Sequence, residues 1–122
     1  MIDKKAIEVY LELVRRTLSS DGLLIFSSRE KNLAFLERQG FTISEIRECI
    51  SSLSASNYCS GPMYDSSGEN RNDVWIFGTR VNDVEVYIKI SFGDTLNKVI
   101  CISFHEAEHV MLYPYGGEND KN

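Results

Sequence analysis

Four side chains that can exchange protons or bind anions recur at alternate positions in two neighbouring stretches of the chain. They are Tyr87, Lys89, Ser103 and His105. A phenol, an ammonium, a hydroxyl and an imidazole on one face of a rigid sheet would form an acid–base and anion-binding set. The alternative interpretation of the same pattern is an ordinary solvated sheet face.

The two stretches that carry these residues have the alternation of β-strands. In Val84–Ser91 and in Val99–His105, aliphatic or aromatic residues occupy the even-numbered positions, and most polar residues occupy the odd-numbered ones. A period of two places the two sets on opposite faces of a strand. If the even-numbered side chains pack on helices, the four polar residues lie together on the opposite, more hydrated face.

Three helical patterns precede these strands. The first runs from Asp3 to about Ser19, and the second covers Arg29–Gln39 and ends at Gly40. The third begins at a capping box formed by Thr42 and Glu45. Leu23–Ser27 is too short to distinguish a strand from an extended packing segment.

This order of elements predicts an α+β domain of two layers. A further strand, Asp73–Arg80, is followed by a hairpin turn at Asn82-Asp83. We therefore expect N-terminal helices packed on one face of an antiparallel sheet of three strands, or four if Leu23–Ser27 joins it. The 122 residues predict a single domain, with an N-terminal helix in residues 1–20, a mobile surface loop at 65–72 and a disordered tail at 116–122.

The composition narrows the possible partners and compartments. The net charge of −5 arises entirely in the second half of the chain, which argues against strong non-specific binding of nucleic acid. It permits a local basic patch or a basic partner protein. No apolar run is long enough to span a bilayer and no signal peptide is visible, so we expect no membrane association. Three cysteines without a CxxC spacing indicate free thiols in the cytoplasm.

Residues 105–109, with the sequence HEAEH, match the HExxH motif of zinc peptidases. That motif requires both histidines on one helix, whereas His105 directly follows a strand pattern and the next residues leave little room for a helix. The simpler interpretation is a segment whose histidines are exposed or hydrogen-bonded. Likewise, Trp75 and Phe77 alternate on one strand face and could stack on bases, although such pairs more often pack within a protein.

Several segments, taken in order, resemble one family. The segments are Leu53–Tyr58, Ser60–Pro62, Asp73–Gly78, Val86–Ile90 and Ile102–Glu108. Over roughly residues 30 to 115, the chain resembles the toxins of the motility quorum-sensing regulator type, which belong to bacterial toxin–antitoxin pairs. The resemblance implies a RelE-like fold, cleavage of messenger RNA without a metal or other cofactor, and a cognate antitoxin as protein partner.

The family's site residues transfer only in part. Its Tyr on the strand before the last corresponds to Tyr87, and its Lys after the Ser-Phe pair of the last strand is replaced by His105. A Lys of the central connection is replaced by Cys59, and a Gln beside the strand Trp by Ile76. One of the four polar positions is therefore retained, and another carries a different ionisable group.

The leading prediction is a toxin that cleaves messenger RNA through attack by the ribose 2′-OH. His105 is expected to act as base or acid, Tyr87 to orient the 2′-OH or donate a proton, and Lys89 to offset charge on the phosphorane. Arg80 and Trp75 are expected to contact the RNA. The alternative is a non-catalytic interaction or regulatory domain derived from the same fold, which the acidic second half favours. A zinc metallopeptidase is the third possibility.

Overall fold

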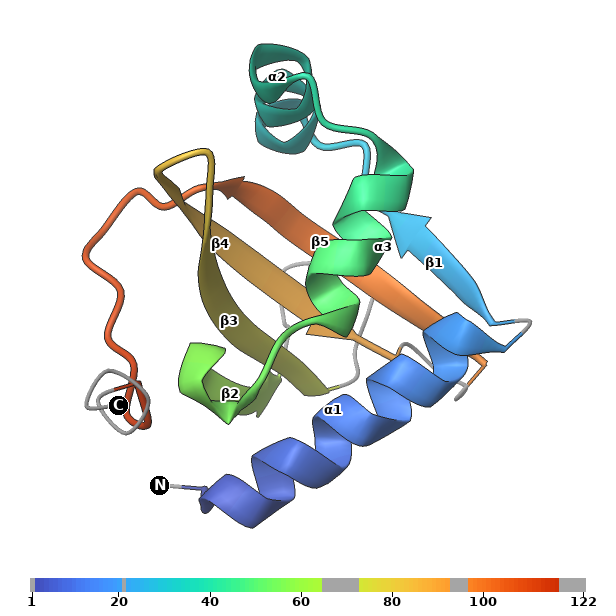
Figure 1. Cartoon of the computed structure of the whole chain (residues 1–122), viewed down its shortest axis with the longest axis vertical. Coiled ribbons are helices and arrows are strands. Elements are labelled where there is room, and N and C mark those ends of the chain that lie inside the picture. Colours follow the sequence, from blue (N-terminus) through green and yellow to red (C-terminus); the bar gives the residue numbers. More distant parts are fainter. Residues whose placement is uncertain (1, 21, 65–72, 93–96, 117–122) are drawn as a thin grey trace.

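The computed structural model describes residues 2–20, 22–64, 73–92 and 97–116. These residues form three α-helices, a short 3-10 helix and five strands (Figure 1). In chain order the elements are α1 (Lys4–Ser19), β1 (Leu23–Phe26), α2 (Glu30–Gln39), α3 (Ile43–Ser51), η1 (Ala55–Asn57), β2 (Tyr58–Tyr64), β3 (Asp73–Val81), β4 (Val84–Ser91) and β5 (Lys98–Glu106). The predicted loop at 65–72 and nearly all of the predicted tail lie outside the described residues.

The sheet is larger than the sequence predicts. Its strand order is β1-β5-β4-β3-β2. The strands β2 to β5 are antiparallel neighbours, whereas β1 runs parallel to β5. The α+β class is confirmed, but the sheet has five strands and is mixed rather than antiparallel.

The additional strand, β2, is absent from the predicted elements, and it contains Gly61-Pro62. Proline cannot donate a hydrogen bond to a neighbouring strand, so within sheets it is confined largely to edges and bulges. Here β2 is an edge strand, and its pairing with β3 shifts register on both sides of Ser60. An irregular edge strand of this kind has no clear alternation in the sequence.

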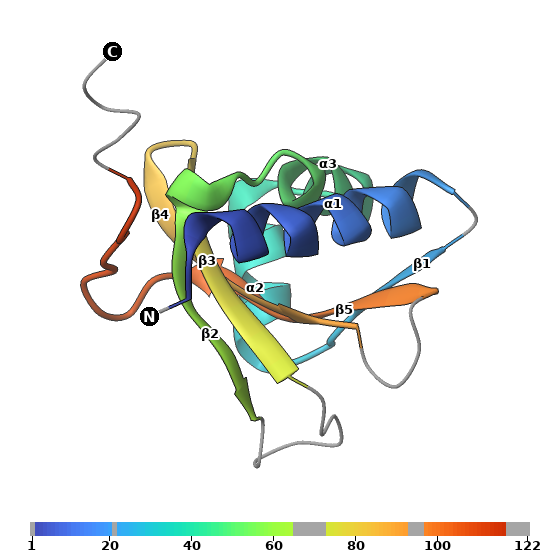
Figure 2. The same ribbon diagram turned by 90° about the horizontal axis from the view of Figure 1, so that it is seen from below.

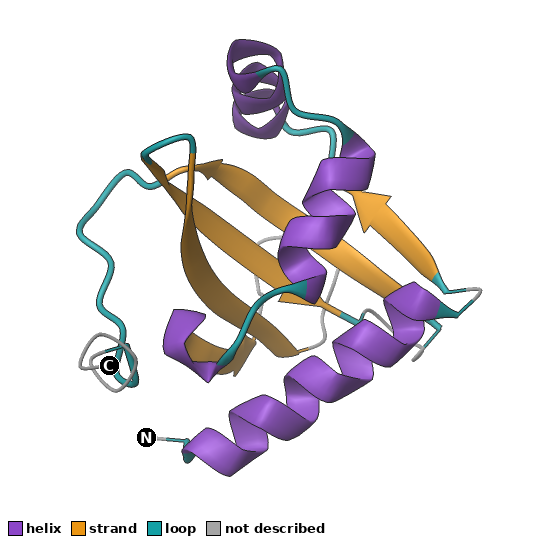
Figure 3. Ribbon diagram, in the orientation of Figure 1, coloured by secondary structure: helices purple, strands orange, loops and turns teal. Residues whose placement is uncertain are grey.

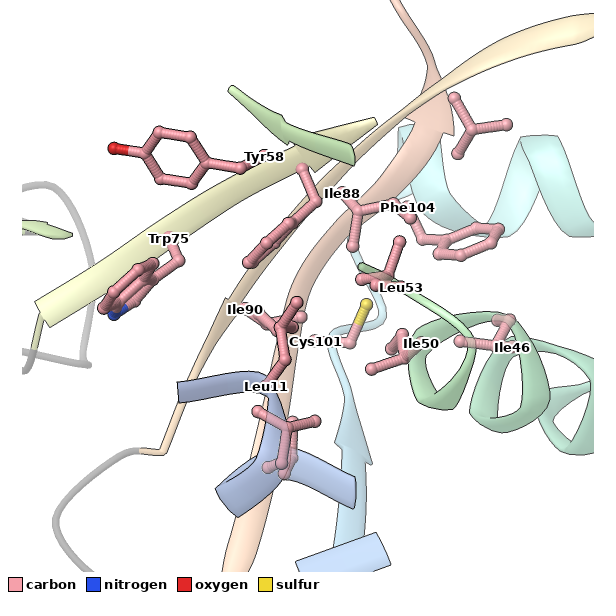
Figure 4. Close-up of a cluster of buried hydrophobic side chains, with 14 of the residues drawn as sticks. Leu11, Ile46, Ile50, Leu53, Tyr58, Trp75, Ile88, Ile90, Cys101 and Phe104 are labelled. Atoms are coloured by element: carbon pink, nitrogen blue, oxygen red, sulfur yellow. The ribbon is translucent and has the colours of Figure 1, made fainter. Parts of the chain in front are cut away.

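Two helices cover one face of the sheet. Figure 2 shows α1 and α3 side by side on that face, as the two-layer prediction requires, and Figure 3 separates this helical layer from the strands. The core between the layers includes Leu11 from α1, Ile46 and Ile50 from α3, and Ile88 and Phe104 from the sheet (Figure 4). The capping box predicted for α3 is present, since Thr42 and Glu45 each accept a hydrogen bond from the other's backbone N–H.

A bulge in β5 alters the predicted alternation. Ser103 pairs with Lys89 and Cys101 pairs with Ile90, so Ile102 has no opposite residue on β4. An extra residue reverses the facing of the side chains that precede it. Val99 and Cys101 therefore join the core, although they stand at odd-numbered positions of the strand like Ser103 and His105.

The helix α2 lies beside the C-terminal half of β5, where β1 has already ended. Asn32 is completely buried there, and its Nδ2 donates to the carbonyl oxygens of Ser27 and Ile102, each at 3.0 Å. The backbone N–H of Phe104 donates to Asn32 Oδ1 at 3.0 Å. The asparagine thus replaces a strand partner at this edge and fixes α2 beside the part of β5 that leads to His105.

Within the part of the chain described here, no helix has the length and apolarity needed to cross a lipid bilayer.

Candidate functional site

The four polar residues predicted to share a sheet face do so. Tyr87 pairs with His105 and Lys89 pairs with Ser103 between β4 and β5. Residues directly opposite each other in an antiparallel pair project to the same face. The rings of Tyr87 and His105 are stacked, with centroids 5.4 Å apart and planes inclined by 23°.

One of these two pairs lines a pocket of about 450 Å³, and the other does not. Tyr87 and His105 line it, whereas Lys89 and Ser103 do not. Its other walls come from Cys59 and Ser60 of β2, Ile76 of β3, and the segment from Glu108 to Leu112. The candidate site is therefore the Tyr87–His105 end of the polar face.

The segment that follows β5 forms one wall of this pocket, and several hydrogen bonds hold it. The backbone N–H of Ala107 donates to the Glu85 carbonyl at 2.8 Å, and the Tyr113 hydroxyl donates to Glu85 Oε2 at 2.7 Å. Tyr113 packs over Gly78, where a Cβ atom would lie 2.3 Å from its hydroxyl oxygen. Figure 1 shows this segment passing from the end of β5 toward the N-terminus.

The hydrogen bond of the His105 ring identifies the nitrogen that is available to accept a proton. Its Nδ1 lies 2.9 Å from the carbonyl oxygen of Glu106. A carbonyl can only accept, so Nδ1 carries the hydrogen. In the neutral ring Nε2 then has a free lone pair and can accept a proton.

Tyr87 is suited to donate a hydrogen bond rather than to accept a proton. Burial raises the pKa of its phenol and the neighbouring Cys59 adds to the effect, while the positive charge of Arg29 partly opposes it. Burial, with a contribution from Glu85, likewise raises the pKa of Cys59 to about 12. Cys59 is therefore a neutral thiol beside the phenol and not a ready nucleophile.

Two cations from the start of α2 act on groups of this site. Arg29 immediately precedes the helix, and its charge acts on Tyr87. Lys31 forms an ion pair with Glu108, and its hydrogen bond and charge are the main causes that lower the pKa of that carboxyl, with His105 and His109 contributing less. Sequence reasoning assigned these cations no function, because more than 50 residues separate them from Tyr87 and only the packing of α2 brings them close.

The two residues predicted to contact RNA lie outside the pocket. Trp75 is 7% exposed and faces the helical layer, where its ring stacks on Tyr10 at 4.0 Å. It is therefore not placed to stack on a base, and its predicted contact with RNA does not fit this structure. Arg80 is exposed in the β3–β4 hairpin and donates to the Asp83 carbonyl at 2.7 Å.

The HEAEH stretch does not have the geometry of a zinc peptidase. His105 lies on β5, and His109 follows the end of that strand, so the two histidines do not share a helix. Among the residues that the structure describes, no group of three or more His, Cys, Asp or Glu side chains is arranged to hold a metal ion.

Comparisons of the chain with models of protein families, with curated proteins and with solved structures found no match. The resemblance of its short segments to the motility quorum-sensing regulator toxins therefore stays a prediction, and the function is argued from the pocket.

Proposed function

We propose that the protein is a metal-independent endoribonuclease of the toxin type that cleaves messenger RNA. The observation that carries this proposal is the stacked pair of Tyr87 and His105 in the wall of the pocket. RNA supplies its own nucleophile, the ribose 2′-OH. Such a site needs only a base, a proton donor and a cation near the phosphate.

His105 is the proposed base. Its Nε2 takes the proton of the 2′-OH as the 2′ oxygen attacks the adjacent phosphorus. The new P–O bond gives a 2′,3′-cyclic phosphate, and the bond to the 5′ oxygen of the next nucleotide breaks. His105 becomes an imidazolium in this step, held in position by its Nδ1–H bond to the Glu106 carbonyl.

Tyr87 is the proposed proton donor. Because its pKa is raised, the phenol is protonated and can supply the hydrogen that the departing 5′ oxygen needs. The neighbouring His105 imidazolium then returns a proton to the phenolate, so that one proton moves in total from the 2′ oxygen to the 5′ oxygen. The centroids of the two rings are 5.4 Å apart, so both groups lie in the same part of the pocket wall.

Arg29 is the proposed phosphate ligand. A guanidinium can donate two parallel hydrogen bonds to phosphate oxygens and remains charged at any relevant pH. Its charge already acts on Tyr87, although neither Arg29 nor Lys89 lines the pocket. Arg29 therefore joins Lys89, the cation expected from the sequence, as a proposed phosphate ligand.

The test is cleavage of a mixed-sequence RNA in the presence of EDTA, together with growth arrest on induced expression. We expect His105→Ala and Tyr87→Phe each to lower the cleavage rate by about 10²- to 10⁴-fold, the usual contribution of acid–base groups. Tyr10→Phe is a matched control, since it removes a buried hydroxyl that belongs to α1 and does not line the pocket. Unchanged cleavage and toxicity in both site variants would refute the assignment.

A non-catalytic interaction domain is the second candidate, and one observation favours it. Val110 and Leu112 are 87% and 75% exposed on the segment that borders the pocket, an apolar surface suited to a protein partner. The toxin proposal also includes such a partner, an antitoxin encoded by a neighbouring gene. Binding of that neighbour by a wild-type protein that neither cleaves RNA nor arrests growth would favour the interaction domain over the enzyme.

A further inference from the structure

A second hollow adjoins the pocket at His105. It has a volume of about 260 Å³ and lies between α2 and the end of β5. His105 and Glu108 line both hollows. The two therefore meet at the proposed base, and an extended ligand in the pocket can continue into the second hollow, which we call the α2 groove.

One face of α2 lines this groove with two cations. Lys31, Ala34 and Arg38 follow the spacing i, i+3 and i+7, which places them on the same side of a helix. With a rise of 1.5 Å per residue, the two cations are about 10 Å apart along the axis. Ala34 and Phe35 form an apolar floor between them.

Both cations are paired with carboxylates that belong to the opposite wall of the groove. Lys31 Nζ lies 2.5 Å from Glu108 Oε2, and Arg38 Nη1 lies 3.9 Å from Glu106 Oε1. All four side chains are at least half exposed. Exposed ion pairs contribute little to stability, so phosphate groups can replace the carboxylates at small cost.

We propose that the RNA strand passes from the pocket across His105 into the α2 groove, where its phosphates bind Lys31 and Arg38 in place of Glu108 and Glu106. This inference rests on the proposed function and adds the path of the substrate. The two glutamates act as competitors for the cations and weaken the binding of RNA. In a chain of net charge −5, a local pair of cations beside the base provides the attraction that the overall charge lacks.

Single-stranded RNA fits the groove better than an acidic peptide does, because the strand must pass His105 for its phosphodiester to be cleaved. The apolar floor between the cations suits the face of a base or ribose between two phosphates. An acidic peptide would use the same two cations but would have no reason to extend into the pocket.

The test measures binding of a short, labelled single-stranded oligonucleotide pool whose 2′-O-methyl groups prevent cleavage. The double variant Lys31→Gln/Arg38→Gln should bind it at least tenfold more weakly at low salt. The plot of log affinity against log salt concentration should become shallower, its slope decreasing in magnitude by about 1.4, since each phosphate contact on a single strand contributes about 0.7. Glu106→Gln/Glu108→Gln should bind it more tightly than the wild type.

The matched controls remove equal charge from α1. They are Lys5→Gln/Arg16→Gln and Glu8→Gln/Glu12→Gln, all at exposed positions. Changes confined to the α2-groove variants support the inference. Equal changes in the controls, no change in the α2-groove variants, a wild type that does not bind the pool, or a wild type that prefers an acidic peptide to the pool would each overturn it. Cleavage that depends on His105 but not on Lys31 and Arg38 would refute the path and leave the proposed function standing.

Discussion

Asn32→Ala is the substitution that best tests how α2 is joined to the sheet. The side chain of Asn32 is completely buried and makes three hydrogen bonds of 3.0 Å, two to carbonyl oxygens and one from the Phe104 N–H. Alanine retains the helix but removes all three bonds. It leaves the backbone groups of Ile102 and Phe104 without partners inside the protein.

The expected loss of stability follows from these bonds. Each contributes about 0.5–1.5 kcal/mol net, and a buried group left unsatisfied costs about 1–3 kcal/mol. Three bonds of this kind give an expected loss of roughly 2–4 kcal/mol in the free energy of unfolding. That is a large share of the roughly 5–15 kcal/mol typical of a domain.

Urea unfolding, followed by circular dichroism and linear extrapolation, measures the loss. Gln39→Ala is the matched control, because it removes an amide on the same helix that accepts an exposed hydrogen bond of 3.1 Å from Asn82. It should cost less than about 0.5 kcal/mol. If Asn32→Ala costs no more than Gln39→Ala, the reasoning about the edge of β5 is wrong. If Asn32→Ala stays folded but loses RNA cleavage, that result supports the proposal that α2 positions the cations.

Two further predictions concern the pocket wall and a half-buried thiol. Gly78→Ala should displace the segment after Ala107, because the new Cβ would lie 2.3 Å from the Tyr113 hydroxyl oxygen. Faster amide exchange in residues 107–116, with the helices still protected, is the expected signature, and unchanged exchange would contradict it. Burial raises the pKa of Cys49 from 9.0 to about 11, so the folded protein retains this proton where an unfolded chain releases it. Stability from this source is complete below about pH 9 and lost as the pH rises toward 11, so the free energy of unfolding should decline over that range. The decline should be smaller in Cys49→Ala, and an identical decline in both proteins would exclude Cys49 as its cause.

Local patterns in the sequence were enough to predict the class of the fold and the shared face of the polar residues. The alternation of apolar and polar residues in Val84–Ser91 depends only on the two-residue period of an extended backbone. The strand β4 begins and ends at these same two residues. The capping box of α3 is equally local, since it joins residues three positions apart. From such local rules the common face of Tyr87 and His105 could be predicted, because both follow the apolar alternation of their strands.

Which of these residues surround a pocket depends on how the strands pair in the folded chain. The bulge at Ile102 depends on how β5 pairs with β4, and the irregular strand β2 depends on an edge provided by β3. The bulge places Val99 and Cys101 in the core while Ser103 and His105 stay on the polar face.

The position of α2 is also a tertiary property, because Asn32 holds the helix to backbone groups about 70 residues away. That attachment brings Arg29, Lys31 and Arg38 to the site around His105. No spacing of residues in the sequence predicts this position of α2. Local periodicity reports which face a side chain occupies, whereas contacts between distant segments determine which side chains meet.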